Sequence, residues 1–179
     1  MKTVQVLDKK FYLSISHEQI QVAITKVAEQ MNEDLKNEDV IFLGILNGAF
    51  LFAADLFKQI NFDTQISFLK VASYSGTSTS GTVKRLIGLN EDIENKTVVV
   101  LEDIIDSGIT MEYLLKQLKG YDPKEIKIAT LLFKPEAFVK DYNIDYIGME
   151  IPNDFIVGYG LDYDGYGRNL KDIYTLLVE

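Results

Sequence analysis

The sequence predicts an α/β fold in which helices flank a mainly parallel, twisted sheet. Short apolar runs recur along the chain, with the length and composition of strands that are buried on both faces. Segments with the apolar spacing of amphipathic helices separate several of these runs, as crossover connections between parallel strands require. A chain of 179 residues suits one domain, 1–179, and we expect a core at about 16–150 and a smaller hood formed by about 1–15 and 151–179.

The individual elements follow from apolar spacing and from end signals. Ser16 and Gln19 have the spacing of a capping box, and apolar residues of one helical face follow them, which predicts a helix over 16–35. Gly120 is expected to end a later helix. The predicted elements after the first helix are, in order, a buried strand at 40–46, a mostly buried helix at 49–60, strands at 64–71 and 96–103, a helix at 111–120, strands at 125–133 and 145–151, and a last strand near 172–178.

The composition limits the classes of partner. With 18 Lys and Arg against 27 Asp and Glu, the net charge is −9, which argues against nucleic acids and anionic membranes as partners. It does not exclude a small anionic substrate, because backbone amides and a metal ion can reverse the local sign of the potential. The absence of Cys excludes thiol chemistry and agrees with a cytoplasmic location. The single histidine, His17, is expected to be solvated in the first turn of a helix.

The most informative segment is 98–115, in which an apolar strand runs directly into acidic residues. Glu102 and Asp103 end the strand, Asp106 follows two Ile residues, and the sequence Ser-Gly-Ile-Thr at 107–110 opens a helix. Ligands of open α/β sheets bind at the carboxyl ends of strands, and a helix N-terminus with free amides and hydroxyls suits a phosphate. Carboxylates cannot bind the phosphate, but they can hold sugar hydroxyls or Mg²⁺. The segment therefore predicts a sugar-phosphate site.

The alternative is a strand that ends in solvated acids, with Asp106 as a helix N-cap. That arrangement accounts for one carboxylate and leaves Glu102 and Asp103 unexplained. Neither GxxxxGK[ST] nor GxGxxG occurs in the sequence, so nucleoside-triphosphatase chemistry has no support.

The run EDIIDSGIT after VVVL resembles the phosphoribosyl-pyrophosphate signature of the type I phosphoribosyltransferases. From about residue 40 to the C-terminus, the chain resembles the bacterial hypoxanthine (hypoxanthine-guanine) members of that family. The other segments that carry the resemblance are the loop at 46–48, the Ser-, Thr-, Gly- and Tyr-only run 73–82, Lys134, and IPNDFIVGYGLDYDGYGRNL at 151–170.

The resemblance implies an enzyme and its substrates. Such an enzyme transfers the 5-phosphoribosyl group from phosphoribosyl pyrophosphate to N9 of hypoxanthine, and of guanine, to give IMP or GMP and pyrophosphate, with Mg²⁺ as cofactor. The resemblance also implies that the chain forms a homodimer or homotetramer. It implies no nucleic acid partner and no membrane partner.

The resemblance further implies a role for each matching residue. Asp106 would act as general base toward the purine N7 proton, and Lys134 would select a 6-oxopurine, because an ammonium group can only donate. Phe155 would stack on the purine, and Glu102, Asp103 and Asp162 would hold the metal. The residues implied to bind phosphoribosyl pyrophosphate are Leu46, Asn47, Gly48, Ser73, Tyr74, Glu102, Asp103, Asp106, Ser107, Gly108, Ile109, Thr110 and Arg168. Those implied to bind the purine are Lys134, Phe155, Ile156 and Asp162.

Several alternatives stay open at this point. The residues at 47–48 also fit an ordinary Asn-Gly turn, and some family members carry Lys where Asn47 stands. The run 73–82 fits a surface loop as well as the lid that the family closes over the diphosphate. A regulator that binds nucleic acid would need a basic face, and a transferase specific for xanthine differs only in contacts at the purine 2-position.

Overall fold

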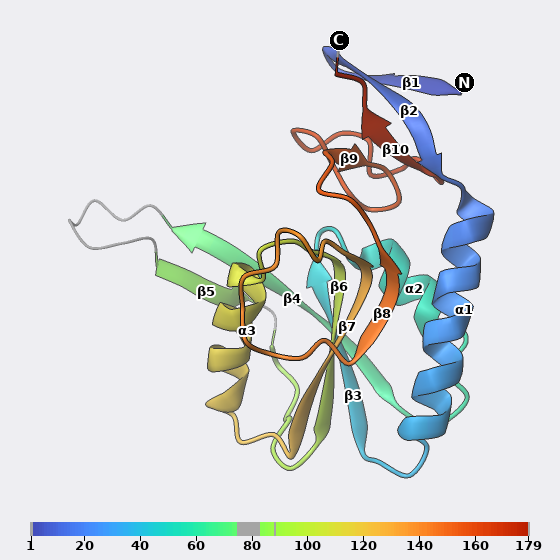
Figure 1. The fold of residues 1–179 in the computed structure, drawn as a ribbon. Coiled ribbons are helices and arrows are strands. Elements are labelled where there is room, and N and C mark those ends of the chain that lie inside the picture. Colours follow the sequence, from blue (N-terminus) through green and yellow to red (C-terminus); the bar gives the residue numbers. More distant parts are fainter. Residues whose placement is uncertain (1, 75–82, 88, 179) are drawn as a thin grey trace.

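The structure, a computed structural model, describes residues 2–74, 83–87 and 89–178, and the side chains outside 71–88. This part of the chain forms a large sheet with flanking helices and a smaller sheet above it (Figure 1). The helices are α1 (His17–Asp34), α2 (Phe50–Phe57) and α3 (Ile109–Lys119). The strands of the large sheet are β3 (Val40–Leu46), β4 (Gln65–Tyr74), β5 (Val83–Ile87), β6 (Thr97–Ile105), β7 (Glu125–Phe133) and β8 (Tyr146–Glu150). Those of the small sheet are β1 (Thr3–Val6), β2 (Lys9–Ile15), β9 (Ile156–Val157) and β10 (Ile173–Leu176).

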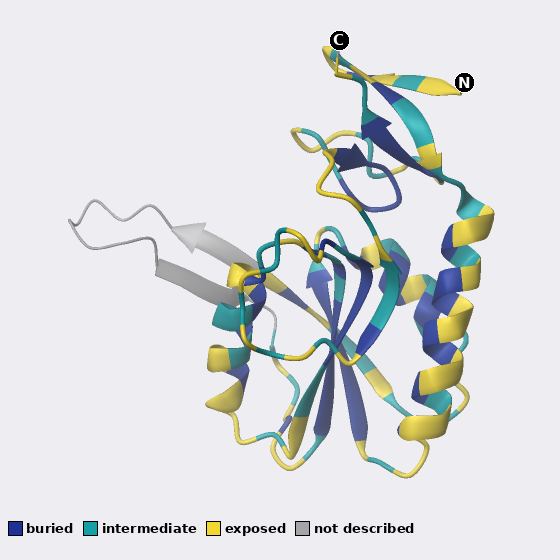
Figure 2. Ribbon diagram, in the orientation of Figure 1, coloured by how far each residue is buried: buried dark blue, intermediate teal, exposed yellow. Residues whose placement is uncertain are grey.

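The large sheet confirms the predicted α/β class. Its strand order is β5-β4-β3-β6-β7-β8, and every neighbouring pair except β4 and β5 is parallel. The two apolar runs VIFLGIL and VVVL form the central strands β3 and β6, which are buried along most of their length (Figure 2). Central parallel strands are covered on both faces, which is why these runs do not alternate with polar residues.

Helices cover both faces of this sheet. Val40 and Phe42 of β3 face the core formed with α1 and α2, whereas Ile41 and Leu43 face the core formed with α3. This division follows from the two-residue period of a strand. None of the helices in the described ranges is long and apolar enough to cross a membrane.

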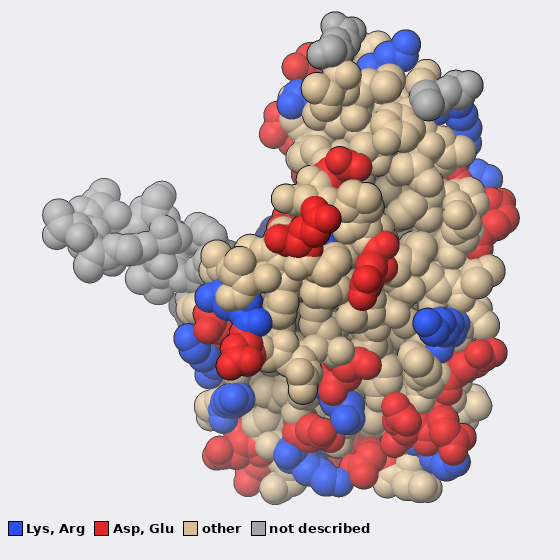
Figure 3. All heavy atoms as spheres, viewed as in Figure 1, with Lys and Arg blue, Asp and Glu red and all other residues tan. Residues whose placement is uncertain are grey.

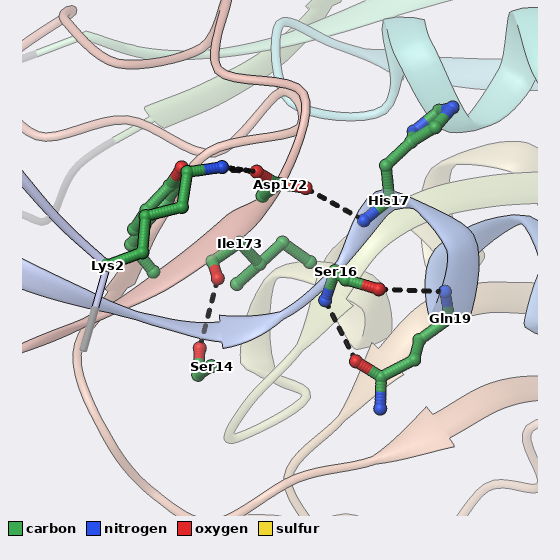
Figure 4. A network of polar contacts seen from close by, with 8 residues as sticks. Lys2, Ser14, Ser16, His17, Gln19, Asp172 and Ile173 are labelled. Atoms are coloured by element: carbon green, nitrogen blue, oxygen red, sulfur yellow. Dashed lines mark hydrogen bonds and ion pairs between the residues drawn. The ribbon is translucent and has the colours of Figure 1, made fainter.

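The start of α1 has the capping box that the sequence predicts. The Ser16 hydroxyl accepts a hydrogen bond from the backbone amide of Gln19. In return, the Gln19 side-chain oxygen accepts one from the backbone amide of Ser16 at 2.9 Å (Figure 4). The predicted stop at Gly120 is also confirmed, since α3 ends at Lys119 with Gly120 as its C-cap.

The small sheet, which we call the hood sheet, joins the two ends of the chain. Its order is β1-β2-β10-β9, and all its pairs are antiparallel. The strands β1, β2, β5 and β9 were not predicted individually. They lack long apolar runs, and β2 is stabilised by pairing with β10, which lies near the other end of the sequence.

A polar network anchors the hood sheet to the start of α1. The Asp172 carboxylate is only 3% exposed, and it accepts hydrogen bonds from the Lys2 ammonium at 2.7 Å and from the His17 amide at 2.9 Å (Figure 4). The Tyr174 hydroxyl donates to the same carboxylate at 3.1 Å. These donors, Lys2 first, lower the pKa of Asp172 to about 2 from its ordinary value of 3.8.

This network predicts a pH-dependent contribution to stability. Because the pKa of Asp172 is lower in the folded than in the unfolded chain, its contribution is complete above about pH 4 and is lost as the pH falls toward 2. We expect Asp172→Asn to lower Tm at pH 7 by about 2–4 °C, which corresponds to about 1 kcal/mol at this length. Thermal unfolding followed by circular dichroism measures this shift. The control is Glu33→Gln, which affects only an exposed pair with Lys36; equal shifts in both variants would contradict the prediction.

The structure corrects the expectation for His17. Its ring packs against Tyr159, with centroids 6.3 Å apart, and its Nδ1 atom is buried without a hydrogen-bond partner in the described part of the chain. His17 is therefore half-buried with its Nδ1 atom shielded from solvent, because Tyr159 from the segment beyond β8 packs against it, which the helix alone does not reveal.

Candidate active site

The carboxyl ends of the central strands bring distant segments of the sequence together. The loop at 46–48 follows β3, Asp103 lies near the end of β6, and Lys134 directly follows β7. These strands are adjacent and parallel, so their carboxyl ends meet at one edge of the sheet. This is the position at which open α/β sheets bind ligands.

Glu102 and Asp103, which we call the acid pair, share an environment that disfavours their charged forms. Desolvation by the surrounding protein raises the pKa of the Glu102 carboxyl well above its usual value, and the neighbouring Asp103 charge raises it further. Desolvation also raises the pKa of Asp103. Its hydrogen bonds with the Glu102 side chain and with the backbone amide of Ile104 oppose that effect, and the charge of Arg168 opposes it to a smaller extent. A ligand that supplies a cation or hydroxyl donors would relieve this cost.

Residues 106–110, which we call the phosphate turn, line a small cavity beside the acid pair. The cavity has a volume of about 110 Å³ and is bounded by Glu102 and by residues 104–111. Gly108 is the N-cap of α3 and has a φ of +79°, a left-handed conformation that glycine adopts without strain. The turn therefore presents the first amides of α3 to the cavity, an arrangement suited to an anion.

The segment that follows Lys134 supports the back of the phosphate turn. The Tyr142 hydroxyl donates a hydrogen bond to the Gly108 carbonyl at 2.9 Å. A Cβ atom on Gly108 would lie 2.6 Å from this hydroxyl and from the Phe138 ring. Burial raises the pKa of Tyr142 to about 12, so its hydroxyl stays protonated and can donate at neutral pH.

Lys134 joins the phosphate turn to the hood. Its side chain is buried, with 7% of the residue exposed. The ammonium lies 3.6 Å from the Asp106 carboxylate and donates a hydrogen bond to the Asp154 carbonyl at 2.8 Å. Asp154 immediately precedes Phe155, so one cation contacts both a carboxylate of the turn and the backbone beside an aromatic residue.

The loop after β3 is held between the acid pair and the hood. A Cβ atom on Gly48 would lie 1.7 Å from an Asp103 carboxylate oxygen, and one on Gly160 would lie 2.1 Å from the Gly48 carbonyl. Only glycine permits both close approaches. The peptide bond between Leu46 and Asn47 is cis.

Arg168 and Asp162 pair with each other in the hood. One guanidinium nitrogen lies 2.6 Å from the Asp162 carboxylate, and the other donates to the Gly160 carbonyl at 2.6 Å. The second Asp162 oxygen accepts from the Gly165 amide. Asp162 therefore lies beside the cation predicted to reach the diphosphate, and both of its oxygens have partners.

Phe155 and Ile156 differ in exposure. Phe155 is 45% exposed, whereas Ile156 lies in β9 and is 9% exposed. An exposed ring next to the segment held by Lys134 can offer a face to a planar ligand.

The remaining predicted residues have a more limited description. Ser73 and Tyr74 lie at the end of β4, and their side chains, like residues 75–82, fall outside the described part. Within that part, no group of three or more His, Cys, Asp or Glu residues could by itself hold a metal ion. Two residues that contact the site, Tyr142 and Gly160, were not singled out from the sequence. Neither their residue types nor their spacing from other residues indicated a role there.

Comparison with known proteins yields a consistent set of relatives. Residues 15–164 match the family described as the phosphoribosyl transferase domain. The hypoxanthine-guanine phosphoribosyltransferase of Mycobacterium tuberculosis is 41% identical over 169 residues, covering 90% of this chain and 84% of that protein. That of Aquifex aeolicus is 37% identical over 174 residues, covering 96% of this chain and 98% of that protein.

Solved structures of related enzymes superpose closely on this fold. A crystal structure of a hypoxanthine-guanine phosphoribosyltransferase from Bacillus anthracis superposes with a TM-score of 0.84 at 37% identity, covering 92% of this chain and 98% of that chain. A hypoxanthine phosphoribosyltransferase from Staphylococcus aureus superposes with a TM-score of 0.83 at 36% identity, covering 99% of this chain and 98% of that chain.

Proposed function

This chain belongs to the phosphoribosyltransferase family as a purine salvage enzyme of the hypoxanthine-guanine type, and we propose that the residues at the carboxyl ends of β3, β6 and β7 carry out its reaction. The reaction transfers the 5-phosphoribosyl group of phosphoribosyl pyrophosphate to N9 of hypoxanthine or guanine. The bond between the sugar C1 carbon and the diphosphate breaks, and the products are IMP or GMP and pyrophosphate. One observation carries the proposed assignment of roles. The buried Lys134 ammonium contacts both the Asp106 carboxylate and the Asp154 carbonyl, which immediately precedes Phe155. The proximity of a cation, a carboxylate and the backbone beside an aromatic residue supports the proposed roles.

We assign proton transfer to Asp106. As purine N9 attacks the sugar carbon, N7 must lose its proton, and the Asp106 carboxylate beside Lys134 would accept it. Lys134 donates to the 6-oxo group and selects against a 6-amino group, which would meet a second donor. The exposed Phe155 ring stacks on the purine, and Ile156 offers its backbone to the edge of the base.

We assign the phosphoribosyl group to the acid pair and the phosphate turn. The carboxylates of Glu102 and Asp103 accept the ribose hydroxyls, and the residues from Asp106 to Thr110 hold the 5-phosphate with amides and hydroxyls. The loop at 46–48 and Arg168 bind the diphosphate, with Ser73 and Tyr74 closing over it. The protein thus contributes mainly position and charge, and no covalent intermediate with the chain is needed.

We propose that Mg²⁺ is the cofactor. The donor set fits this ion, because Mg²⁺ prefers oxygen ligands and is usually held by one or two carboxylates together with water and substrate phosphates. Glu102 and Asp103 would supply the carboxylates, and Asp162 would join them once it is released from Arg168. When bound, the ion neutralises charge on the diphosphate leaving group.

Tyr142 offers a test of the phosphate turn. We expect Tyr142→Phe to raise the KM for phosphoribosyl pyrophosphate about 2- to 10-fold, because the turn loses the hydrogen bond to the Gly108 carbonyl. Initial rates at saturating hypoxanthine measure this effect. Tyr121→Phe, at a residue that is 52% exposed beyond the end of α3, is the control. An unchanged KM in Tyr142→Phe would remove the supporting role.

A spectrophotometric assay with phosphoribosyl pyrophosphate, Mg²⁺ and each purine in turn tests the function as a whole. We expect activity with hypoxanthine and guanine and none with adenine. Activity with xanthine alone would change the specificity assignment, and activity with no purine would overturn the proposal.

A regulator that binds nucleic acid is the rival from another class. On the face shown in Figure 3, the basic side chains of the described residues are scattered among acidic ones and form no continuous stripe. Together with the net charge of −9, this favours catalysis over binding of a polyanion. We also propose that the enzyme is cytoplasmic and forms a homodimer or homotetramer. Light scattering coupled to size-exclusion chromatography would measure the oligomeric state.

A further inference from the structure

The Phe155 ring packs against a residue of the N-terminal hairpin, which is formed by β1 and β2. Phe11, on β2, is completely buried, and its ring centroid lies 6.2 Å from that of Phe155 with the planes tilted by 38°. This separation lies within the range at which two aromatic rings attract each other. Phe155 therefore rests on a ring contributed by the opposite end of the chain.

Backbone pairing fixes this contact. The Phe155 carbonyl accepts a hydrogen bond from the Leu176 amide at 2.9 Å, and Leu176 of β10 is paired with Phe11 of β2. The sheet thus places Phe11 and Phe155 on either side of one β10 residue. Because both contacts are made by backbone groups, they fix the relative position of the two backbone segments from which the rings project.

Tyr163 is a second aromatic neighbour of the Phe155 ring. Its ring meets Phe155 edge-on, with centroids 5.9 Å apart and an interplanar angle of 88°, and it also contacts Phe11 at 6.4 Å. The Tyr163 hydroxyl donates to the Asp8 carboxylate at 2.9 Å, and the Lys9 ammonium lies 4.7 Å from the Tyr163 centroid. Asp8 in the turn of the hairpin and Lys9 at the start of β2 thereby hold Tyr163 in place.

We propose that Phe11 and Tyr163 are positioning residues for purine binding, which hold the Phe155 ring in the orientation that stacks on the base. The inference rests on the proposed role of Phe155 and extends the purine site to the N-terminal hairpin. Phe155 is 45% exposed and would otherwise sample several rotamers, so fixing it beforehand lowers the entropy lost on binding.

Steady-state kinetics of Phe11→Leu test the proposal. We expect the KM for hypoxanthine to rise about three- to tenfold, the range that aromatic pairs support, while kcat and the KM for phosphoribosyl pyrophosphate stay within about twofold. Val4→Ala is the matched control, since Val4 pairs with Phe11 across the hairpin and packs in the same cluster. Thermal unfolding of both variants separates loss of stability from loss of positioning.

A double-mutant cycle shows whether Phe11 acts through Phe155. In a Phe155→Leu background, we expect Phe11→Leu to cause little additional rise in the KM for hypoxanthine. Independent effects that multiply in the double variant would overturn the proposal, as would equal rises in both KM values for Phe11→Leu.

Tyr163 provides a second test if Phe11→Leu does not fold. Tyr163→Leu should raise the KM for hypoxanthine selectively, and Tyr163→Phe, which keeps the ring and loses only the bond to Asp8, should raise it less. Equal effects of the two substitutions, or none, would contradict the proposal. A wild-type enzyme inactive with hypoxanthine would instead refute the proposed function, so the two failures are distinguishable.

Discussion

Replacing Asp106 by Asn is expected to lower kcat with hypoxanthine about 10²- to 10⁴-fold, the range for loss of a general base. The amide has nearly the same shape as the carboxylate but cannot accept the N7 proton. Asp106 lies at the start of the phosphate turn, where its side chain faces the Lys134 ammonium at 3.6 Å. The loss should therefore fall on the chemical step.

Binding of phosphoribosyl pyrophosphate separates this role from a structural one. Calorimetric titration should give an affinity for phosphoribosyl pyrophosphate within a few-fold of wild type in Asp106→Asn, because the amides of the phosphate turn remain. Asp141→Asn, at an exposed position in the segment after Lys134, is the control. Turnover in Asp106→Asn close to that of Asp141→Asn would remove the general-base assignment.

Replacing Lys134 by Ala is expected to lower kcat/KM for hypoxanthine about 10- to 100-fold, as for the loss of a hydrogen bond to a charged group. The KM for phosphoribosyl pyrophosphate should change far less. The structure gives a second reason for the purine-specific loss, because the Lys134 ammonium also holds the Asp154 carbonyl next to Phe155. Removing it both deletes the contact to the 6-oxo group and releases the backbone beside the stacking ring.

A change of specificity distinguishes this role from general destabilisation. The side chain in Lys134→Gln can accept as well as donate, so discrimination between hypoxanthine and adenine should weaken. Lys140→Ala, which removes a cation paired with Glu112 on α3, is the control. Equal losses toward both substrates in Lys134→Ala would mean that Lys134 is only structural.

Local patterns in the sequence were sufficient to identify the residues in the central part of the candidate site. These residues lie in one short segment, 102–110, which contains the acid pair, Asp106 and the residues up to Thr110. An apolar strand that ends in acidic residues and leads into a polar helix start therefore identifies them together. Lys134 had no such signal, since a single Lys at the end of a strand is usually solvated. Its significance came from the family resemblance, and only the structure showed that it is buried between Asp106 and Asp154.

The sequence by itself determined the α/β class, the core strands and the phosphate turn, because periodicity and chain order encode them over short distances. The tertiary structure alone decided which distant residues meet. Phe11 supports Phe155 through strands near opposite ends of the chain, Tyr142 supports Gly108, and Gly160 packs on Gly48. Such contacts depend on sheet order and on the path of loops, and a pattern of neighbouring residues contains no information about either.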